Sequence, residues 1–183
     1  MKIYLLGFDG TTFRDKRYIE KHPLIRSGHV GLQFEDDPRI WGFSPSPAAE
    51  KAAGSIEALI NQLKNHLRQP GIIQDDTLVF HEAHSMYRDG EPLTEVLILT
   101  YEVSAADFYR IKQTLLEWYN TKKEFWYNFP TWEGTFNQDE YNCATFPQVL
   151  GLPLPSENGL LETYLRLMKD EKGATPWQPN SKS

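Results

Sequence analysis

The sequence predicts a single α+β domain in which an antiparallel sheet packs against helices. Short runs rich in β-branched and aromatic residues are separated by only a few polar residues, as in antiparallel hairpins. Longer segments carry apolar residues at three- and four-residue steps, as amphipathic helices do. The chain has 183 residues and is 40% hydrophobic, which suits one core in the common domain range of about 100–200 residues.

The first part of the chain is predicted to contain three strands and a helix. Residues 1–9 form a first strand, and the polar segment 10–21 forms a loop. His29–Phe34 and Arg39–Ser44 are two strands of a hairpin. A helix begins at Ser55 and ends before Pro70, because its apolar residues recur with helical spacing: Ile56, Leu59, Ile60, Leu63 and Leu67.

The middle of the chain is predicted to contain two more strands and a long helix. Residues 77–82 and 95–103 are strand candidates, the second rich in Val, Ile, Leu, Thr and Tyr. Asp89-Gly90 predicts a turn between them. Ser104 to Asp107 resembles a capping box and starts a helix, whose apolar stripe consists of Phe108, Ile111, Leu115 and Tyr119.

The C-terminal part is predicted to add two helices after an aromatic loop. Residues 122–138 form the loop, a helix opens at Cys143, and a last helix starts at about Ser156. Residues 1–172 then form one domain. The polar segment 173–183 is expected to be a disordered tail.

The charge balance argues against partners with a phosphate backbone. The formal net charge is −6 and the isoelectric point is near 5.4, and no cluster of Lys and Arg offers the footprint that nucleic acids or anionic membranes require. No apolar stretch approaches the roughly 20 residues of a membrane span, and the N-terminus lacks a signal-peptide cleavage site. One cysteine cannot form an internal disulfide. We expect a cytoplasmic protein, or one exported by a secretion system that reads no N-terminal signal.

A cysteine and a histidine form the candidate catalytic pair. Cys143 is the only cysteine, and Asn142 before it is a favoured N-cap, so the thiol is expected in the first turn of a helix, which favours the thiolate. His29 is expected on a strand, with Gly28 and Gly31 beside it to permit close approach by another chain. These two side chains are the minimum for a nucleophile with a general base. The alternatives are a buried structural cysteine and an ordinary strand histidine.

Motifs around these residues resemble those of a known superfamily. Ser27-Gly28-His29-Val30-Gly31-Leu32 is followed by Trp41-Gly42-Phe43-Ser44-Pro45, and Asn142-Cys143-Ala144-Thr145 comes far downstream. The chain thereby resembles the circularly permuted NlpC/P60-like proteins of the papain fold, in which the histidine strand precedes the cysteine helix. The resemblance implies a permuted papain-like fold and a cysteine hydrolase, such as a bacterial cell-wall amidase or peptidase, or an effector or toxin domain.

The third catalytic role departs from the pattern that the resemblance implies. In the acyltransferase-like members a second histidine falls near the position of Trp41 or Gly42, and neither residue can orient an imidazole. If Glu35–Pro38 is a four-residue turn, the strand register pairs His29 with Ser44. Ser44 is therefore the expected orienting residue, with a backbone carbonyl as the alternative.

Other aromatic and imidazole side chains are weaker candidates for binding. Trp41, Trp126 and Trp132 are expected either to line a substrate groove or to pack in the core. His81 and His84 have a His-x-x-His spacing, but no third or fourth ligand is identifiable, and tetrahedral zinc needs them. We therefore expect neither a metal nor a cofactor.

Together these residues predict attack on an amide or related acyl bond. Cys143 would attack the carbonyl carbon, and His29 would carry the proton. Asn142 is expected to cap the turn, while the Cys143 backbone N–H is the expected oxyanion donor. The expected partner is a peptide, protein or peptidoglycan-like substrate. Two alternatives stay open: a non-catalytic binding domain on the same fold, and a thiol acyltransferase, for which the expected apolar anchor is missing.

Overall fold

The molecule is an α+β structure, as the sequence predicts. The computed structural model describes residues 1–10, 28–85, 87–88, 91–92, 94–131, 136–156 and 159–179. The strands of its large sheet are β1 (Lys2–Phe8), β2 (His29–Phe34), β3 (Ile40–Pro45), β4 (Gln69–Asp75), β7 (Leu97–Glu102), β8 (Phe125–Tyr127), β9 (Glu140–Tyr141) and β10 (Thr175–Pro176). The helices are α3 (Pro47–Ala53), α4 (Ile56–Lys64), α5 (Thr77–Ser85), α6 (Ala105–Thr121) and α7 (Leu161–Asp170), with a 3₁₀ helix η1 (Phe146–Leu150).

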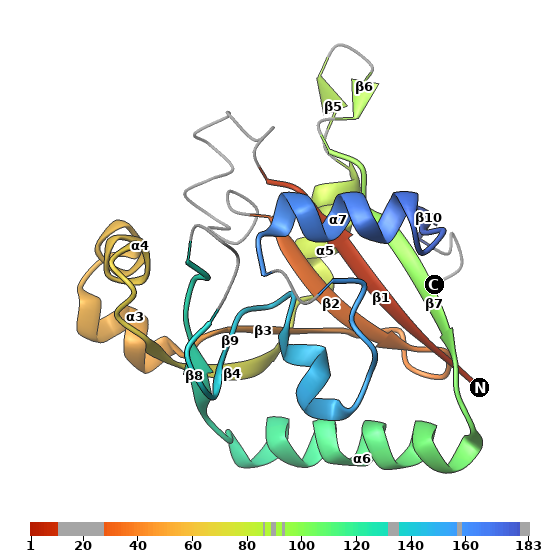
Figure 1. Cartoon of the computed structure of the whole chain (residues 1–183), viewed down its shortest axis with the longest axis horizontal. Helices are drawn as coiled ribbons and strands as arrows, with labels where there is room; N and C mark the ends of the chain where they lie inside the picture. Colours follow the sequence, from red (N-terminus) through yellow and green to blue (C-terminus); the bar gives the residue numbers. More distant parts are fainter. Residues whose placement is uncertain are drawn as a thin grey trace.

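The eight strands form one twisted sheet in the order β10-β7-β1-β2-β3-β4-β8-β9. Neighbouring strands are antiparallel except β8 and β9, which are parallel. A separate pair, β5 (Tyr87–Arg88) and β6 (Glu91–Pro92), projects beyond the sheet in Figure 1. The predicted hairpin is confirmed, because β2 and β3 pair antiparallel on either side of the polar turn.

Helices cover the two faces of the sheet unequally. On one face α6, η1 and α7 pack against strand residues such as Leu5, Leu32 and Phe43 in the larger core. On the other face α5 packs against Phe8 and Ile40 in a smaller core. Figure 1 shows α6 along the lower border, η1 between α6 and the strands, and α7 across the upper part of the sheet. The sheet therefore lies between two helical layers.

Two helix starts follow from the capping residues. Ser104 accepts a hydrogen bond from the Asp107 N–H at the start of α6, as predicted. Ser55 does the same for Ala58 at the start of α4. Each cap satisfies a backbone donor that the first helical turn leaves without an intrahelical partner. The predicted strand at the N-terminus and the one at 95–103 are also confirmed, as β1 and β7.

The predicted strand at residues 77–82 is wrong. These residues lie in α5, while the strand occupies residues 69–75 as β4. The short apolar run at Leu78–Phe80 fits either structure, and only the spacing to buried Ala83 reveals the helical face. The helix predicted to end before Pro70 is α4, which ends at Lys64, and Pro70 lies near the start of β4. Strands tolerate proline at their first positions and at edges.

Three further differences concern short elements. The segment 122–138 was predicted as a loop, but β8 extends the sheet there, and α3 was not predicted. The last helix begins at Leu161 rather than at about Ser156. Residues 11–21 of the predicted first loop and the predicted Asp89-Gly90 turn lie outside the described residues.

Residues 175–177 of the expected disordered tail belong to the fold. β10 pairs with β7, with Thr175 opposite Ile98. Trp177 is buried in the smaller core, and its N–H donates to the Val96 carbonyl. The pairing with β7 and the burial of the Trp177 indole therefore order a segment whose polar composition alone predicted disorder. Residues 180–183 lie outside the description.

No helix in the described ranges is long and apolar enough to cross a membrane.

Candidate functional site

His29 stands where two strands of the sheet separate. β2 and β3 pair from Gln33–Ile40 to Gly31–Gly42, and no further pair follows toward His29. The imidazole is fully buried, and its Nε2 lies 2.8 Å from Asp76 Oδ2. A buried hydrogen bond of this kind fixes the ring orientation and the tautomer.

Asp76 is placed by the junction between β4 and α5. Its N–H donates to the Ile40 carbonyl at 2.8 Å, and its own carbonyl accepts from Phe80 at 3.2 Å, which starts the helix. The residue is 4% exposed. Backbone bonds on both sides therefore hold the carboxylate against the imidazole. Asp76 is the functional candidate that the sequence interpretation missed.

Gly42 makes room for this pair. A Cβ atom built at position 42 would overlap Asp76 Oδ2 and His29 Nε2. Any other residue would therefore have to displace one partner of the hydrogen bond. Glycine is required at the opposite position, Gly31, for a different reason, because a Cβ atom there would meet the Ile40 and Phe80 side chains.

Cys143 lies in a turn that Asn142 holds together. Asn142 Oδ1 accepts hydrogen bonds from the N–H groups of Ala144 and Thr145, both at 3.0 Å. Its Nδ2 donates to the Gly159 carbonyl at 2.8 Å, so the turn is tied to the segment that leads into α7. The asparagine side chain is thereby engaged in capping, which is the role that we expected for it. The Cys143 N–H donates to no described residue.

The expected α-helix at Cys143 is wrong. Residues 143–145 form a turn, and the helix that follows is the five-residue 3₁₀ helix η1. Gly151 ends it in the left-handed conformation, with φ of 82°. The field of such a short helix is small, so an adjacent side chain rather than a helix dipole must provide the positive charge that favours a thiolate.

His29 can provide that charge. Burial alone lowers the pKa of His29, but the negative charge of Cys143, the hydrogen bond to Asp76 and the hydrogen-bonding interaction with Cys143 outweigh it and raise the pKa to about 10. The sulfur and the imidazole are therefore neighbours. His29 Nδ1 has no hydrogen bond of regular geometry to any described residue. With this pKa, His29 is an imidazolium at neutral pH, beside the Cys143 thiol.

Two buried tyrosines also lie within range of the thiol charge. Burial raises the pKa of Tyr127 well above its ordinary value, and the charges of Cys143 and Asp76 add to this. Burial likewise raises the pKa of Tyr164, with smaller contributions from Tyr101 and Cys143. Both phenols therefore stay neutral. The Tyr164 hydroxyl, on α7, has no hydrogen-bond partner within the described ranges.

Access to the thiol is narrow. Cys143 is 8% exposed and borders an apolar cavity of about 10 Å³, whose walls include Gly31, Trp41, Leu115 and Phe146. A cavity of this size accommodates at most about one water molecule. A substrate must therefore approach from another side or open the site.

Ser44 does not orient His29. The register that we predicted holds as far as Gly31–Gly42, but the two strands separate before Ser44 could pair with His29. Ser44 lies opposite Ile72 of β4 instead, and its hydroxyl has no hydrogen-bond partner in the described part of the chain. The extrapolated pairing was therefore wrong, and Asp76 makes the contact that we expected of Ser44.

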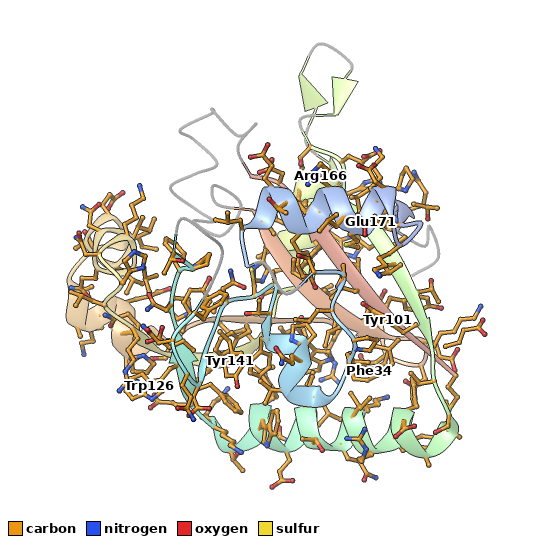
Figure 2. All side chains as sticks on the ribbon, in the orientation of Figure 1. Phe34, Tyr101, Trp126, Tyr141, Arg166 and Glu171 are labelled. Carbon is orange, nitrogen blue, oxygen red and sulfur yellow. The ribbon has the colours of Figure 1, made fainter. Side chains whose placement is uncertain are left out.

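The three tryptophans proposed for a substrate groove differ in position. Trp41 is 2% exposed and packs edge-on against Tyr119, so it lies in the core rather than in an open groove. Trp126 is 40% exposed and lines a surface groove with Tyr141; both are labelled in Figure 2. Trp132 lies outside the described residues.

His81 and His84 have a structural explanation. Each ring lies edge-on to Trp177, with centroids 5.3 and 5.6 Å apart respectively. They hold the C-terminal segment against α5. The described residues contain no group of three or more His, Cys, Asp or Glu side chains that could hold a metal ion.

Comparisons with protein-family models, with curated proteins and with solved structures find no match to this chain.

Proposed function

We propose that the protein is a cysteine hydrolase of the permuted papain-like type, acting through Cys143, His29 and Asp76. The observation that carries the proposal is the buried His29–Asp76 hydrogen bond with the only thiol of the chain beside the imidazole. A nucleophile, a base and a group that orients the base are the parts that covalent acyl transfer requires. Along the chain the histidine precedes the cysteine, in keeping with the resemblance to permuted NlpC/P60-like proteins.

The proposed reaction has two stages. The Cys143 thiolate attacks the carbonyl carbon and forms a C–S bond, while the carbonyl oxygen becomes an oxyanion that the Cys143 N–H can receive. The C–N bond then breaks, and the leaving amine takes the proton from the His29 imidazolium. In the second stage His29 removes a proton from water, and the water oxygen bonds to the thioester carbon. The C–S bond then breaks, the carboxylic acid leaves, and the Cys143 thiolate beside the protonated His29 is restored. Asp76 holds the imidazole throughout and stabilises its charged form.

The substrate class that we propose is an amide or related acyl bond in a peptide, a protein or a peptidoglycan-like polymer. The net charge of −6 disfavours nucleic-acid substrates. A cytoplasmic location, or export as an effector, is part of the same proposal.

Thiol reactivity tests this proposal without knowledge of the substrate. The rate of alkylation of Cys143 by iodoacetamide at pH 7, followed by mass spectrometry, should exceed that of a free cysteine thiol. His29→Ala should slow it by about 10-fold or more, because the reacting thiolate loses the adjacent positive charge that stabilises it. An equal rate in the variant would contradict the proposal.

A second candidate is a non-catalytic binding domain. The low exposure of Cys143 and the small cavity beside it favour this alternative. It predicts alkylation slower than that of a free thiol in the native chain and unaffected by His29→Ala. The same experiment therefore separates the two functions.

A further inference from the structure

A surface groove lies next to the proposed active site on the β8–β9 side of the sheet. It has a volume of about 470 Å³, and its walls include Glu124, Phe125, Trp126, Asp139 and Tyr141. In Figure 2 the labelled Trp126 and Tyr141 lie on the outer strands β8 and β9, which pair in parallel. The groove is large enough for an extended side chain.

The chemistry of the groove walls suits a cation. Two carboxylates, Glu124 and Asp139, line it, and neither forms an ion pair with a described residue. Trp126 and Tyr141 add aromatic rings, whose faces attract ammonium and guanidinium groups. Among the described residues that form the groove walls, none is basic.

Neighbouring basic side chains show that two rings of the groove, those of Trp126 and Phe125, accept cations. The Arg68 guanidinium lies 4.2 Å from the centroid of Trp126, and the Lys123 ammonium lies 5.2 Å from that of Phe125. Neither cation forms an ion pair with Glu124 or Asp139, so these two carboxylates stay available for a cation from outside.

The groove and the thiol share a wall. Tyr141 lies two residues before Cys143. Phe146 borders the small cavity at the thiol, and its ring contacts both Phe125 and Tyr141 of the groove, with centroids 5.1 and 6.2 Å apart. A ligand held at Trp126 is thus separated from the thiol by one aromatic layer.

We propose that this groove binds a lysine or arginine side chain of the peptide or protein on which Cys143 acts. The inference relies on the proposed function only to identify the ligand as the substrate of Cys143. The binding itself requires no catalysis. The carboxylates pair with the cationic group of the bound side chain, and the aromatic rings contact its alkyl stem. The substrate residue that reacts with Cys143 lies a short distance away along the substrate peptide.

Binding is measured on the full chain carrying Cys143→Ala, so that neither turnover nor alkylation contributes. The probe is N-acetyl-arginine N-methylamide, and its control is the citrulline analogue, which has nearly the same shape without the charge. The indole N–H signal of Trp126, assigned with Trp126→Phe, reports binding by NMR. We expect the arginine probe to bind about two- to fivefold more tightly than the citrulline probe, as exposed ion pairs allow.

The double variant Glu124→Gln/Asp139→Asn should abolish this difference between the two probes. Glu102→Gln is the matched control, because this exposed carboxylate lies on β7, five strands away from β8 in the sheet, and it should leave the difference unchanged. Equal binding of the two probes, an unchanged difference in the double variant, or no shift at Trp126 would each overturn the inference. Slow alkylation of Cys143 would instead overturn the proposed function alone.

Discussion

At the scale of single residues, the bond between His29 and Asp76 determines how the imidazole can act. Asp76 engages Nε2, which leaves Nδ1 as the nitrogen for proton exchange with the thiol. The carboxylate is held by backbone bonds to Ile40 and Phe80 rather than by a flexible loop. The geometry is therefore present before any substrate binds.

Asp76→Asn and Ser44→Ala should differ in their effect on thiol reactivity. The asparagine keeps the size of the side chain but loses the charge that helps to raise the pKa of His29. We expect alkylation of Cys143 to slow by about 10-fold, because the imidazole loses the carboxylate that orients it and stabilises its charged form. Ser44→Ala removes a buried hydroxyl without a described partner, so it should leave the rate unchanged and the stability equal or slightly higher. A slower rate in Ser44→Ala alone would restore Ser44 as the orienting residue.

Gly42→Ala should disrupt the site through a single methyl group. Its Cβ would overlap both partners of the His29–Asp76 bond, so we expect thiol alkylation to slow as it does in Asp76→Asn. Overpacking should also cost about 1–3 kcal/mol in the free energy of unfolding. Gly7→Ala is the matched control, because its Cβ would meet the side chain of Leu165 instead. It should destabilise the fold while preserving the alkylation rate; equal loss of reactivity in both variants would contradict this explanation of Gly42.

The raised pKa of His29 predicts how stability depends on pH. Below about pH 6.5 the imidazole is protonated in both the folded and the unfolded chain. Between that value and the folded-state pKa of about 10, only the folded chain holds the proton, so unfolding releases it. The contribution of His29 to the free energy of unfolding is therefore full below pH 6.5 and is lost as the pH rises toward 10, with a slope of at most about 1.4 kcal/mol per pH unit.

Urea denaturation at pH 6, 8 and 10 measures this slope. His29→Gln should flatten the decline, because it removes the titrating group. His66→Asn is the control: His66 is exposed and has a positive φ of 58°, which asparagine tolerates. An identical pH dependence in the native chain and in His29→Gln would show that His29 does not retain its proton in the folded state.

At the scale of elements, the turn around Cys143 depends on one asparagine. Asn142→Ala removes the caps on Ala144 and Thr145 and the bond to the Gly159 carbonyl. We expect a loss of about 1–3 kcal/mol in the free energy of unfolding and slower alkylation, because the thiol loses its position. Both are measured on the same preparation.

Ser104→Ala is the matched control for this prediction. It removes the N-cap of α6, far from the thiol in sequence, and should cost about 1 kcal/mol without changing the alkylation rate. If Asn142→Ala behaves in the same way, with a stability loss and full reactivity, the cap does not position Cys143.

The same scale explains why the sequence indicated two members of the candidate site and not the third. Short β-rich runs and a polar turn were enough to place His29 on a strand, and Asn142 was enough to predict a cap beside Cys143, although the predicted helix there is a turn. Asp76 was missed because residues 77–82 were assigned to a strand. With β4 ending at Asp75 and α5 beginning at Thr77, Asp76 becomes a junction residue, and junctions between elements often carry functional side chains.

At the scale of the whole molecule, pairings between distant segments create short strands that local sequence patterns do not predict. β8 joins β4 across more than fifty residues, and β10 joins β7 from the end of the described chain. Short strands of two or three residues carry almost no periodic signal. Their existence depends on an available sheet edge and on a side chain, such as Trp177, that fills a gap in the core.

Trp177→Ala tests whether the C-terminal segment is part of the fold. The indole is 6% exposed, lies in the core with Phe80 and Ala83 of α5, and is flanked by His81 and His84. Truncation of a buried tryptophan costs about 3–5 kcal/mol, so the urea midpoint should fall markedly. Trp126→Ala is the control, because its indole is 40% exposed and should cost far less. A disordered tail would make the first variant the milder one. The order of the two stability losses therefore shows whether the C-terminal segment completes the smaller core. Alkylation of Cys143, which lies in the larger core on the other face of the sheet, should change little in either variant while the chain remains folded.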